Sequence, residues 1–390
     1  MSQNTKDQQE IENFKKVLEK DAELDKIKAD LSEKKTKVDH KRYTALAKQM
    51  DQDEKDLELA KNIDLSAMSD AQILEIQESN DQYMEAATSC MKFICDTFDT
   101  YIPFFRKNLI LIGAESGHGK STIAANIAYR TMQQINPATG QKCKVLIITN
   151  EEQSEDFINR ITCLNKGWDY SNHASFTKEQ KDTFRRAIPL LTKDGRLTVI
   201  DDDYGGAHGM TTSLEGLESI FDNLMRNKIH YDVIIIDYYQ HFTMSKIDPS
   251  LDEYRVQDKV GRLLDHYKNV YSAPIILLSQ LKPPSQESPR SFKERIEGRK
   301  SIYNVATLAM EIIAVRDDLM TQWTIWKSRF NKGIGTTLKT GFDRGMFVKY
   351  TNDFIEKVQN MKLRREAQAM DKAIGMKNVF NESEEKNEQK

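Results

Sequence analysis

The stretch LILIGAESGHGKSTIAANIAYRTMQQ, residues 109–134, joins an apolar run to a helical segment rich in Ala and Ile through a glycine-containing turn. This turn has the spacing of a P-loop, although Ala114 stands where the usual pattern has its first glycine. Gly117 and Gly119 lack a Cβ atom, so backbone N–H groups can converge on phosphate oxygens, and the following helix directs its N-terminus at the same anion. Such a turn between a predicted strand and a predicted helix indicates a nucleotide-binding site.

Two side chains of the turn have predicted roles at the phosphates. Lys120 is expected to reach the β- and γ-phosphates and to act in catalysis, and the Ser121 hydroxyl is expected to bind Mg²⁺. The residues predicted to surround the nucleotide are Ala114, Glu115, Ser116, Gly117, His118, Gly119, Lys120, Ser121 and Thr122.

Two acidic segments supply what such a site needs for hydrolysis. In DVIIIDYYQHF, Asp237 follows four apolar residues. A carboxylate at the end of a buried strand can hold Mg²⁺ through its water shell, although Asp237 could also be an ordinary turn residue. In KVLIITNEEQSED, Glu151 and Glu152 follow another apolar run, where one carboxylate can orient or deprotonate the attacking water. Glu151 is the candidate base, and the choice between the two glutamates stays open.

From residue 93 to residue 352, short apolar runs alternate with helical stretches. The runs are NLILIG, KVLIIT, LTVIDD, DVIIID, PIILLSQ, MEIIAV and WTIWK. Near-continuous apolar runs separated by helical spacers predict an α/β fold, with a mostly parallel, twisted central sheet flanked by helices.

Charged helical segments are expected on both sides of this domain. Residues 1–62 are dense in Lys, Glu and Asp and contain no Pro or Gly, which predicts a long charged N-terminal helical extension. Apolar residues recur every seven positions at Val17, Leu24, Leu31, Val38 and Ala45. Because the companion positions are mostly charged, a coiled coil, a partner-docking helix and a partly disordered arm all remain open. Residues 63–92 are expected to form a helical linker, and residues 353–390 a charged helix with a disordered tail.

Composition excludes several classes of protein. The net charge of −3 excludes a uniformly basic nucleic-acid coat and leaves room for a local basic channel. The four cysteines fit neither a disulfide framework nor a zinc quartet. No window has the length and apolar character of a membrane span, so we expect no membrane association and a soluble protein of the cytoplasm, or of the host cytoplasm if the source is viral.

Several motifs, in the same order along the chain, resemble the motor domain of DnaB-type replicative helicases, the hexameric superfamily 4 group. They are the P-loop with Ala114, the acidic Glu151 after the second strand, TVIDDD (198–203), IIDYYQHF (235–242), LLSQLK (277–282) and KSRFNKG (327–333). The resemblance covers residues 93–350. It implies a RecA-like P-loop NTPase that uses ATP and Mg²⁺ and assembles as a homo-hexamer.

The resemblance also implies a function and three further site residues. The chain would be a ring-shaped, ATP-dependent single-stranded DNA translocase, a replicative helicase that hydrolyses ATP at subunit interfaces. Gln280 would sense the γ-phosphate, whereas Lys327 and Arg329 would reach the neighbouring subunit's nucleotide, with Arg329 as the arginine finger. Residues two apart on a strand share one face, so both cations can converge on one phosphate.

Two segments are expected to line the DNA channel, residues 243–254 and residues 282–300. The second contains six cations, Lys282, Arg290, Lys293, Arg295, Arg299 and Lys300, which suit a DNA backbone. Three glutamates dilute this charge, so an ordinary solvated loop is the alternative reading. The N-terminal arm could dock a replication partner, such as a primase, a loader or a polymerase.

Two other functions share the same core. One is a RecA-like recombinase, which forms open filaments and for which Gly-rich DNA loops would be expected; residues 282–300 are instead rich in Pro and charge. The other is a nucleotide-regulated adaptor or helicase loader, which could dispense with Glu151 or Arg329.

Overall fold

The computed structural model describes residues 92–94, 98, 108–136, 139–203, 209–271, 273–284, 291–329, 333–368 and 370. The predicted arm, the linker up to residue 91 and the end of the tail lie outside these residues. All described residues fall within one structural unit, Gln82–Lys390. None of the helices described in it has the length and apolar character needed to cross a membrane.

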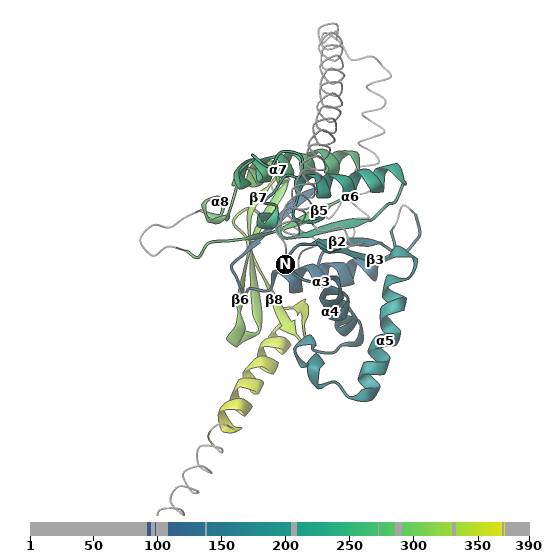
Figure 1. Cartoon of the computed structure of the whole chain (residues 1–390). Helices are drawn as coiled ribbons and strands as arrows, with labels where there is room; N and C mark the ends of the chain where they lie inside the picture. Colours follow the sequence, from purple (N-terminus) through teal and green to yellow (C-terminus); the bar gives the residue numbers. More distant parts are fainter. Residues whose placement is uncertain are drawn as a thin grey trace, which may run out of the picture. The chain divides into compact units, whose positions relative to one another are not determined.

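The predicted apolar runs form strands of a sheet that has nine strands among the described residues, in the order β3-β2-β4-β5-β1-β6-β7-β8-β9 (Figure 1). The strands are β1 (Leu109–Ala114), β2 (Val145–Thr149), β3 (Leu197–Ile200), β4 (Val233–Asp237), β5 (Ile275–Gln280), β6 (Leu308–Val315), β7 (Met320–Ser328), β8 (Thr337–Asp343) and β9 (Met346–Lys349). Neighbours from β3 to β6 pair in parallel, and β7, β8 and β9 add an antiparallel edge. The predicted α/β fold with a mostly parallel sheet is confirmed.

Helices cover both faces of the sheet (Figure 1). They are α3 (Lys120–Met132), α4 (Ser154–Lys166), α5 (Lys178–Thr192), α6 (Leu214–Arg226), α7 (Glu253–Val270), α8 (Phe292–Arg295) and α9 (Ser301–Val305). On one face, Ile110 and Ile112 of β1 belong to a hydrophobic core that includes residues of α3 and α4. On the other face, Leu109 and Leu111 belong to a second core with residues of α6 and α7. Because neighbouring strand residues point to opposite faces, burial on both sides requires continuous apolar runs.

The hairpin of β8 and β9 is absent from the predicted elements. Asp343 pairs with Met346, so Arg344 and Gly345 form a two-residue turn, with φ angles of 50° and 84°. Positive φ at both turn residues matches the twist of the flanking strands. Arg-Gly is a weaker hairpin signal than Asn-Gly or Asp-Gly, which explains why the sequence did not reveal this turn. A helix over residues 352–368 follows the hairpin.

Parallel pairing brings strand ends from distant parts of the chain to one edge of the sheet. The register places Ala114 at the end of β1 opposite Gln280 at the end of β5. It also places Thr149 at the end of β2 opposite Asp237 at the end of β4. The carboxyl ends of the strands are where open α/β sheets bind ligands.

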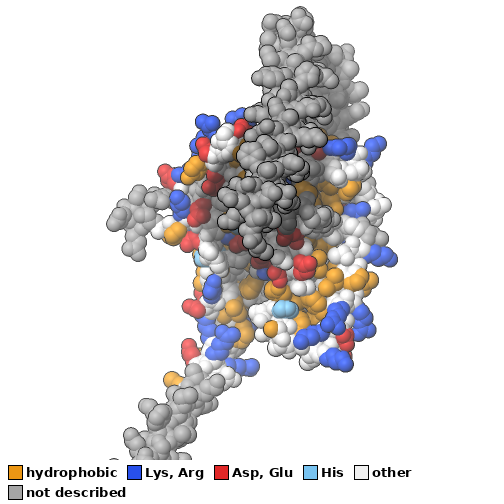
Figure 2. All heavy atoms as spheres, in the orientation of Figure 1, with side chains coloured by type: hydrophobic (Ala, Val, Ile, Leu, Met, Phe, Trp, Pro, Cys, Tyr) orange, Lys and Arg blue, Asp and Glu red, His pale blue; other side chains and the backbone are white. Residues whose placement is uncertain are grey.

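Charge is mixed rather than segregated on the face of the molecule that Figure 2 shows. On the face in Figure 2, the visible described side chains of Lys and Arg are interspersed with those of Asp and Glu, without a continuous basic coat. This distribution agrees with the net charge of −3. A contact with nucleic acid therefore has to be local.

Candidate active site

The P-loop turn lies between β1, which ends at Ala114, and α3, which begins at Lys120. Gly117 and Gly119 have φ angles of 76° and 83°, in the left-handed region that favours glycine. Gly119 is the N-cap of α3 and has no side chain to occupy the first N–H groups of the helix. These groups remain directed at the space before the helix, where an anion is stabilised.

Lys120 and Gln280 meet directly in front of this turn. Lys120 is only 8% exposed, and its Nζ donates a hydrogen bond to Gln280 Oε1 at 2.5 Å. The same ammonium group lies 5.2 Å from the centroid of the Tyr238 ring. The structure therefore brings together two of the residues predicted from the sequence, and it adds Tyr238, which was not predicted.

Asp237 is the most unusual polar group of the site. Its side chain is fully buried, and neither carboxylate oxygen makes a hydrogen bond of good geometry with the described residues. Burial raises the pKa of Asp237 to about 7, the nearby charges of Glu151 and Glu152 add to this rise, and Ser121 and Lys120 oppose it. A fully buried carboxylate with two further carboxylates nearby is rare and calls for a cation.

The donor set beside Asp237 fits Mg²⁺ better than a transition metal. Among the described residues, no group of three or more His, Cys, Asp or Glu side chains could hold a metal ion. Ser121 and Asp237 offer a hydroxyl and a carboxylate. Mg²⁺ suits such a site because it keeps several waters and takes its remaining ligands from substrate phosphates.

The two glutamates after β2 have different surroundings. Glu152 forms an ion pair with Arg160 at 2.9 Å, and the Arg160 side chain is itself largely buried. The Glu151 side chain is exposed and makes no hydrogen bond or ion pair with residues in the described part of the chain. Glu151 also contributes to the raised pKa of Asp237, so its charge lies close to that carboxylate.

A cavity of about 330 Å³ lies beside the P-loop turn. Its lining residues are Gly117, His118, Gly119, Thr122, Ala314, Val315, Arg316, Leu319, Met320, Thr321, Phe342 and Phe347. The Ala314 N–H donates to His118 Nδ1 at 3.2 Å, and Arg316 Nη2 donates to the Gly117 carbonyl at 2.9 Å. These two bonds fix the turn against the end of β6, so the cavity has defined walls.

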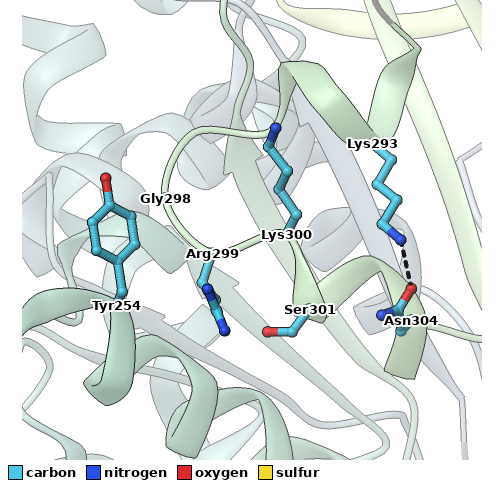
Figure 3. Close-up of a pocket in the computed structure, with 7 residues that line it drawn as sticks. All are labelled: Tyr254, Lys293, Gly298, Arg299, Lys300, Ser301 and Asn304. Carbon is cyan, nitrogen blue, oxygen red and sulfur yellow. Dashed lines mark hydrogen bonds between the residues drawn. The ribbon is translucent and has the colours of Figure 1, made fainter.

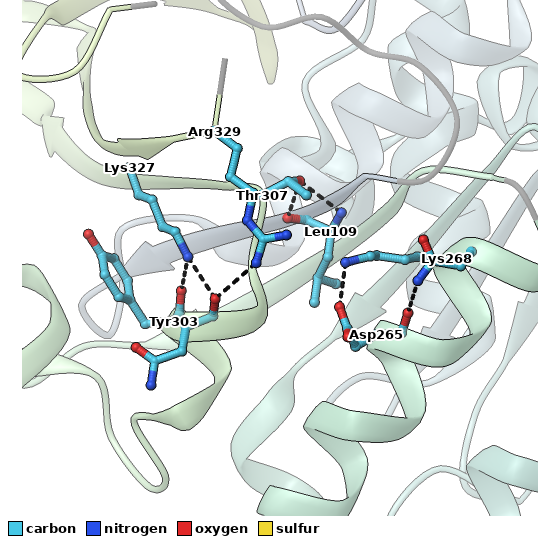
Figure 4. A network of polar contacts seen from close by, with 9 residues as sticks. Leu109, Asp265, Lys268, Tyr303, Thr307, Lys327 and Arg329 are labelled. Carbon is cyan, nitrogen blue, oxygen red and sulfur yellow. Dashed lines mark hydrogen bonds and ion pairs between the residues drawn. The ribbon is translucent and has the colours of Figure 1, made fainter. Parts of the chain in front are cut away.

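Lys327 and Arg329 belong to a polar network beside Thr307 and Leu109 (Figure 4), at the opposite end of β1 from the P-loop. The Arg329 N–H donates to the Thr307 carbonyl, and the Thr307 N–H donates to the carbonyl of Leu109, the first residue of β1. Lys327 Nζ donates to the Asn304 carbonyl at 2.9 Å, and Arg329 Nη2 donates to the same oxygen at 3.3 Å. Both cations therefore point to one acceptor.

The Lys327 ammonium is held in an environment that disfavours its charge. It also donates to the Tyr303 carbonyl at 2.6 Å and lies 5.1 Å from the centroid of the Tyr303 ring. Burial lowers the pKa of Lys327 to about 8, and repulsion from Arg329, Lys268 and Lys293 contributes.

The predicted basic segment is described over residues 282–284 and 291–300, and it contains the short helix α8. Arg295 is buried, and its guanidinium binds Glu115 and Glu311. The expectation that Arg295 offers its charge to a DNA strand is therefore wrong, because Glu115 of the P-loop turn and the buried Glu311 already pair with that charge. Arg290 lies outside the described residues.

Lys293, Arg299 and Lys300 of the same segment border a pocket of about 360 Å³ (Figure 3). Its lining residues are Tyr254, Lys293, Gly298, Arg299, Lys300, Ser301 and Asn304. Tyr254, at the start of α7, is 57% exposed. Arg299 pairs with Asp258 at 2.8 Å, and Lys293 donates to Asn304 Oδ1 at 3.1 Å, whereas Lys300 is exposed. The pocket combines positive charge with an exposed aromatic ring.

Gln240, for which the sequence predicted no role, links the site to this segment. Gln280 N–H donates to Gln240 Oε1 at 3.0 Å, and Gln240 Nε2 donates to the Glu297 carbonyl at 2.7 Å. Gln257 of α7 donates to the Gln240 carbonyl at 3.3 Å and accepts from the Arg299 N–H at 2.7 Å. The only signal in the sequence was an amide side chain within IIDYYQHF, beside Asp237 and His241.

Together, the fold and the turn define a RecA-like P-loop ATPase. Residues 95–290, half of the chain, match the family described as DnaB-like helicase C terminal domain. The chain belongs to this family, and it is an ATPase of the helicase type. No curated protein matches its sequence significantly.

Two solved structures share the fold at low sequence identity. One is described as an "ATPase Domain"; it is 16% identical, with a TM-score of 0.56, and the match covers 73% of this chain and all of that one. The other is described as "The Structure Of A DnaB-Like Replicative Helicase And Its Interactions With Primase"; it is also 16% identical, with a TM-score of 0.55, and the match covers 76% of this chain and 70% of that one. At this identity the likeness concerns the fold alone.

Proposed function

We propose that the chain is the motor subunit of a six-membered replicative helicase ring, which hydrolyses ATP between subunits and moves along single-stranded DNA. The observation that carries this proposal is the position of Arg329. It lies level with Leu109, at the start of β1, whereas the P-loop follows Ala114, at the end of the same strand. The separation is five residues, about 16 Å at the rise of a parallel strand.

This separation exceeds the reach of an arginine side chain, so Arg329 cannot contact the nucleotide of its own subunit. Lys327 points the same way, toward Asn304. A pair of cations at the opposite end of the sheet from the P-loop can serve hydrolysis only at the site of another copy. Such an arrangement predicts head-to-tail assembly with composite active sites.

Within each composite site, the residues divide the work of hydrolysis. The backbone N–H groups of the turn and Lys120 hold the phosphates, and the exposed Glu151 orients the water for in-line attack. Ser121 and Asp237 would hold Mg²⁺, which when bound supplies positive charge against the phosphate oxygens. Gln280 releases Lys120 when a γ-phosphate takes its place as the partner of the ammonium group.

The apolar cavity beside the turn suits the nucleoside of ATP. It adjoins Thr122, just past Lys120 and Ser121, and Phe342 and Phe347 supply aromatic walls. A cavity lined mainly by apolar side chains can hold a nucleobase through contacts with the two faces of the base.

The pocket beside Tyr254 suits a single DNA strand. Lys293, Arg299 and Lys300 supply charge for the phosphates, and the exposed Tyr254 ring supplies a surface on which a base can stack. In this proposal residues 243–254 and 282–300 line the channel, as the sequence predicts, and the N-terminal arm docks a replication partner.

Mixed oligomers test the composite site. Arg329→Ala subunits, which keep the P-loop, are mixed with Lys120→Ala subunits, which keep Arg329, and steady-state ATP hydrolysis is measured in the presence of oligo-dT. Each variant alone should be nearly inactive, whereas mixing should restore activity, because a Lys120→Ala subunit then gives Arg329 to the intact P-loop of an Arg329→Ala neighbour. If no mixture is more active than the two variants alone, Arg329 does not act in trans.

Salt-dependent binding tests the DNA pocket. Fluorescence anisotropy of labelled oligo-dT is followed over a salt series for Lys300→Ala, Tyr254→Leu and the control Lys166→Ala, which changes an exposed residue on the opposite face of the sheet. Lys300→Ala should reduce the slope of log K against log salt by about 1. Tyr254→Leu should weaken binding by about 1–3 kcal/mol at an unchanged slope. If both variants match the control, the strand binds elsewhere.

A further inference from the structure

Arg295 joins the P-loop to the basic segment through a network of buried contacts. Its Nη2 atom binds Glu115 Oε1 at 2.6 Å, and Glu115 is the first residue of the turn after β1. Its Nη1 atom binds Glu311 on β6. Its Nε atom donates to the Lys282 carbonyl at 2.9 Å, and its own carbonyl accepts the Lys282 N–H at 2.7 Å. All three guanidinium nitrogens are therefore engaged, with three different elements.

The two carboxylates that share this guanidinium differ in their freedom. Glu311 has a side chain only 5% exposed, and its Oε2 accepts a hydrogen bond from Trp326 Nε1 at 2.9 Å. Glu115 has a side chain 25% exposed and lies in the turn that would close on phosphate. Glu311 thus fixes Arg295 to the sheet, and Glu115 is the partner that can move.

We propose that Arg295 is a positioning residue that transmits the state of the P-loop to residues 291–300. When the turn closes on a nucleotide, Glu115 shifts relative to the guanidinium. Arg295 then moves α8 together with Lys282, to which it is bound in both directions. The inference rests on the proposed use of the P-loop for ATP and of this segment for DNA.

This role differs from that of Gln280. Gln280 contacts Lys120, which itself touches phosphate, and it reaches residue 297 through Gln240. Arg295 contacts the start of the turn and reaches the segment from inside the core, through charge. The guanidinium of Arg295 is planar and holds several charge-assisted hydrogen bonds in fixed directions, so a shift of one partner moves the others. A lysine cannot replace it, because an ammonium group has no planar fork of donors.

Hydrogen–deuterium exchange of the full chain tests this role. Exchange is measured for peptides covering residues 291–300 without nucleotide and with saturating AMP-PNP and Mg²⁺. The variants are Arg295→Lys, which keeps the charge, and Glu115→Gln, which removes only the P-loop end of the network. Arg185→Lys is the matched control, because it alters an exposed ion pair with Asp182 on α5, outside the P-loop and residues 291–300. A fluorescent ATP analogue verifies that each variant is saturated.

In the wild type and the control, nucleotide should change exchange in this segment by at least about fivefold. In Arg295→Lys and Glu115→Gln the change should fall below about twofold. If Arg295→Lys does not fold, Glu115→Gln alone decides, because it leaves the buried pair with Glu311 intact. A purely structural Arg295 would raise exchange without nucleotide and leave the response to nucleotide unchanged, and that result would overturn the proposal.

If nucleotide does not change exchange over residues 291–300 in the wild type, the proposed role of Arg295 is overturned as well. The exchange experiment contains no DNA, so its outcome is independent of the proposed translocation. If the response is present but oligo-dT does not bind, the DNA part of the proposed function fails and the role of Arg295 stands.

Discussion

The lowered pKa of Lys327 makes ATP hydrolysis by the proposed ring sensitive to alkaline pH. Burial and three neighbouring cations, Arg329, Lys268 and Lys293, lower this pKa from 10.5 to about 8. The groups that face the ammonium from α7 and α9 do not reverse the effect. Lys268 is paired with Asp265, and burial raises the pKa of Tyr303, which keeps its phenol neutral in this range.

The size of the effect follows from this value. A lowered pKa means that the active, protonated form is lost as pH rises through about 8. About nine-tenths of Lys327 is protonated at pH 7 and about one-tenth at pH 9, so kcat/KM should fall about ninefold between these values. The parameter to measure is kcat/KM, because it reports the free enzyme, whereas a bound γ-phosphate raises the pKa in the complex.

Steady-state hydrolysis between pH 6.5 and about pH 9.5, with oligo-dT present, measures this alkaline limb. Lys327→Arg should give a flat profile, because a guanidinium stays protonated throughout. Lys293→Arg, which keeps a cation beside Lys327, should retain the limb. Solution mass at each pH verifies that assembly is unchanged. An alkaline limb with the same midpoint in Lys327→Arg would refute the assignment.

Four further substitutions test the proposed site. Asp237→Asn removes a charge that burial, Glu151 and Glu152 disfavour, so it should raise the melting temperature of the nucleotide-free protein by a few degrees while lowering turnover at least about 100-fold. Glu151→Gln should lower kcat by about 10²–10⁴-fold, and Glu152→Gln, which weakens only the pair with Arg160, should lower it much less; equal losses would contradict the choice of Glu151. Phe342→Ala should raise the KM for ATP several-fold at nearly constant kcat, and a kcat effect alone would place the nucleoside elsewhere.

Local signals were sufficient for much of the fold and for one half of the site. Each strand from β1 to β6 contains an apolar run that stands out in the sequence, because strands buried on both faces cannot alternate. The antiparallel strand β7 instead alternates between buried and less buried residues over Trp323–Trp326. The positions of Asp237 and Gln280 follow from the same signal, since a polar residue directly after such a run lies at the edge of the sheet. The P-loop could be predicted from the spacing of its own residues.

The remaining parts of the site depend on contacts between distant residues. Glu115 and Arg295 are separated by 180 positions, and no local pattern distinguishes Arg295 from Arg299 or Lys300 in the same segment. A count of charges therefore describes residues 282–300 as one basic loop. In the folded chain these cations have different roles, because one is buried against carboxylates and others border an open pocket.

The separation of Arg329 from the P-loop also constrains the assembly. In a two-fold symmetric dimer one self-complementary patch forms the contact, so fingers are exchanged only if Arg329 and the P-loop, at opposite ends of the sheet, both lie in that patch. A heterologous contact has no such requirement, because each subunit then gives Arg329 to one neighbour and receives it from the other. Heterologous contacts either close into rings or continue as filaments. Solution mass with Mg²⁺ and AMP-PNP therefore separates the two proposals that share this core. A single closed species supports the helicase ring, and a mass that grows with concentration supports a recombinase-like filament.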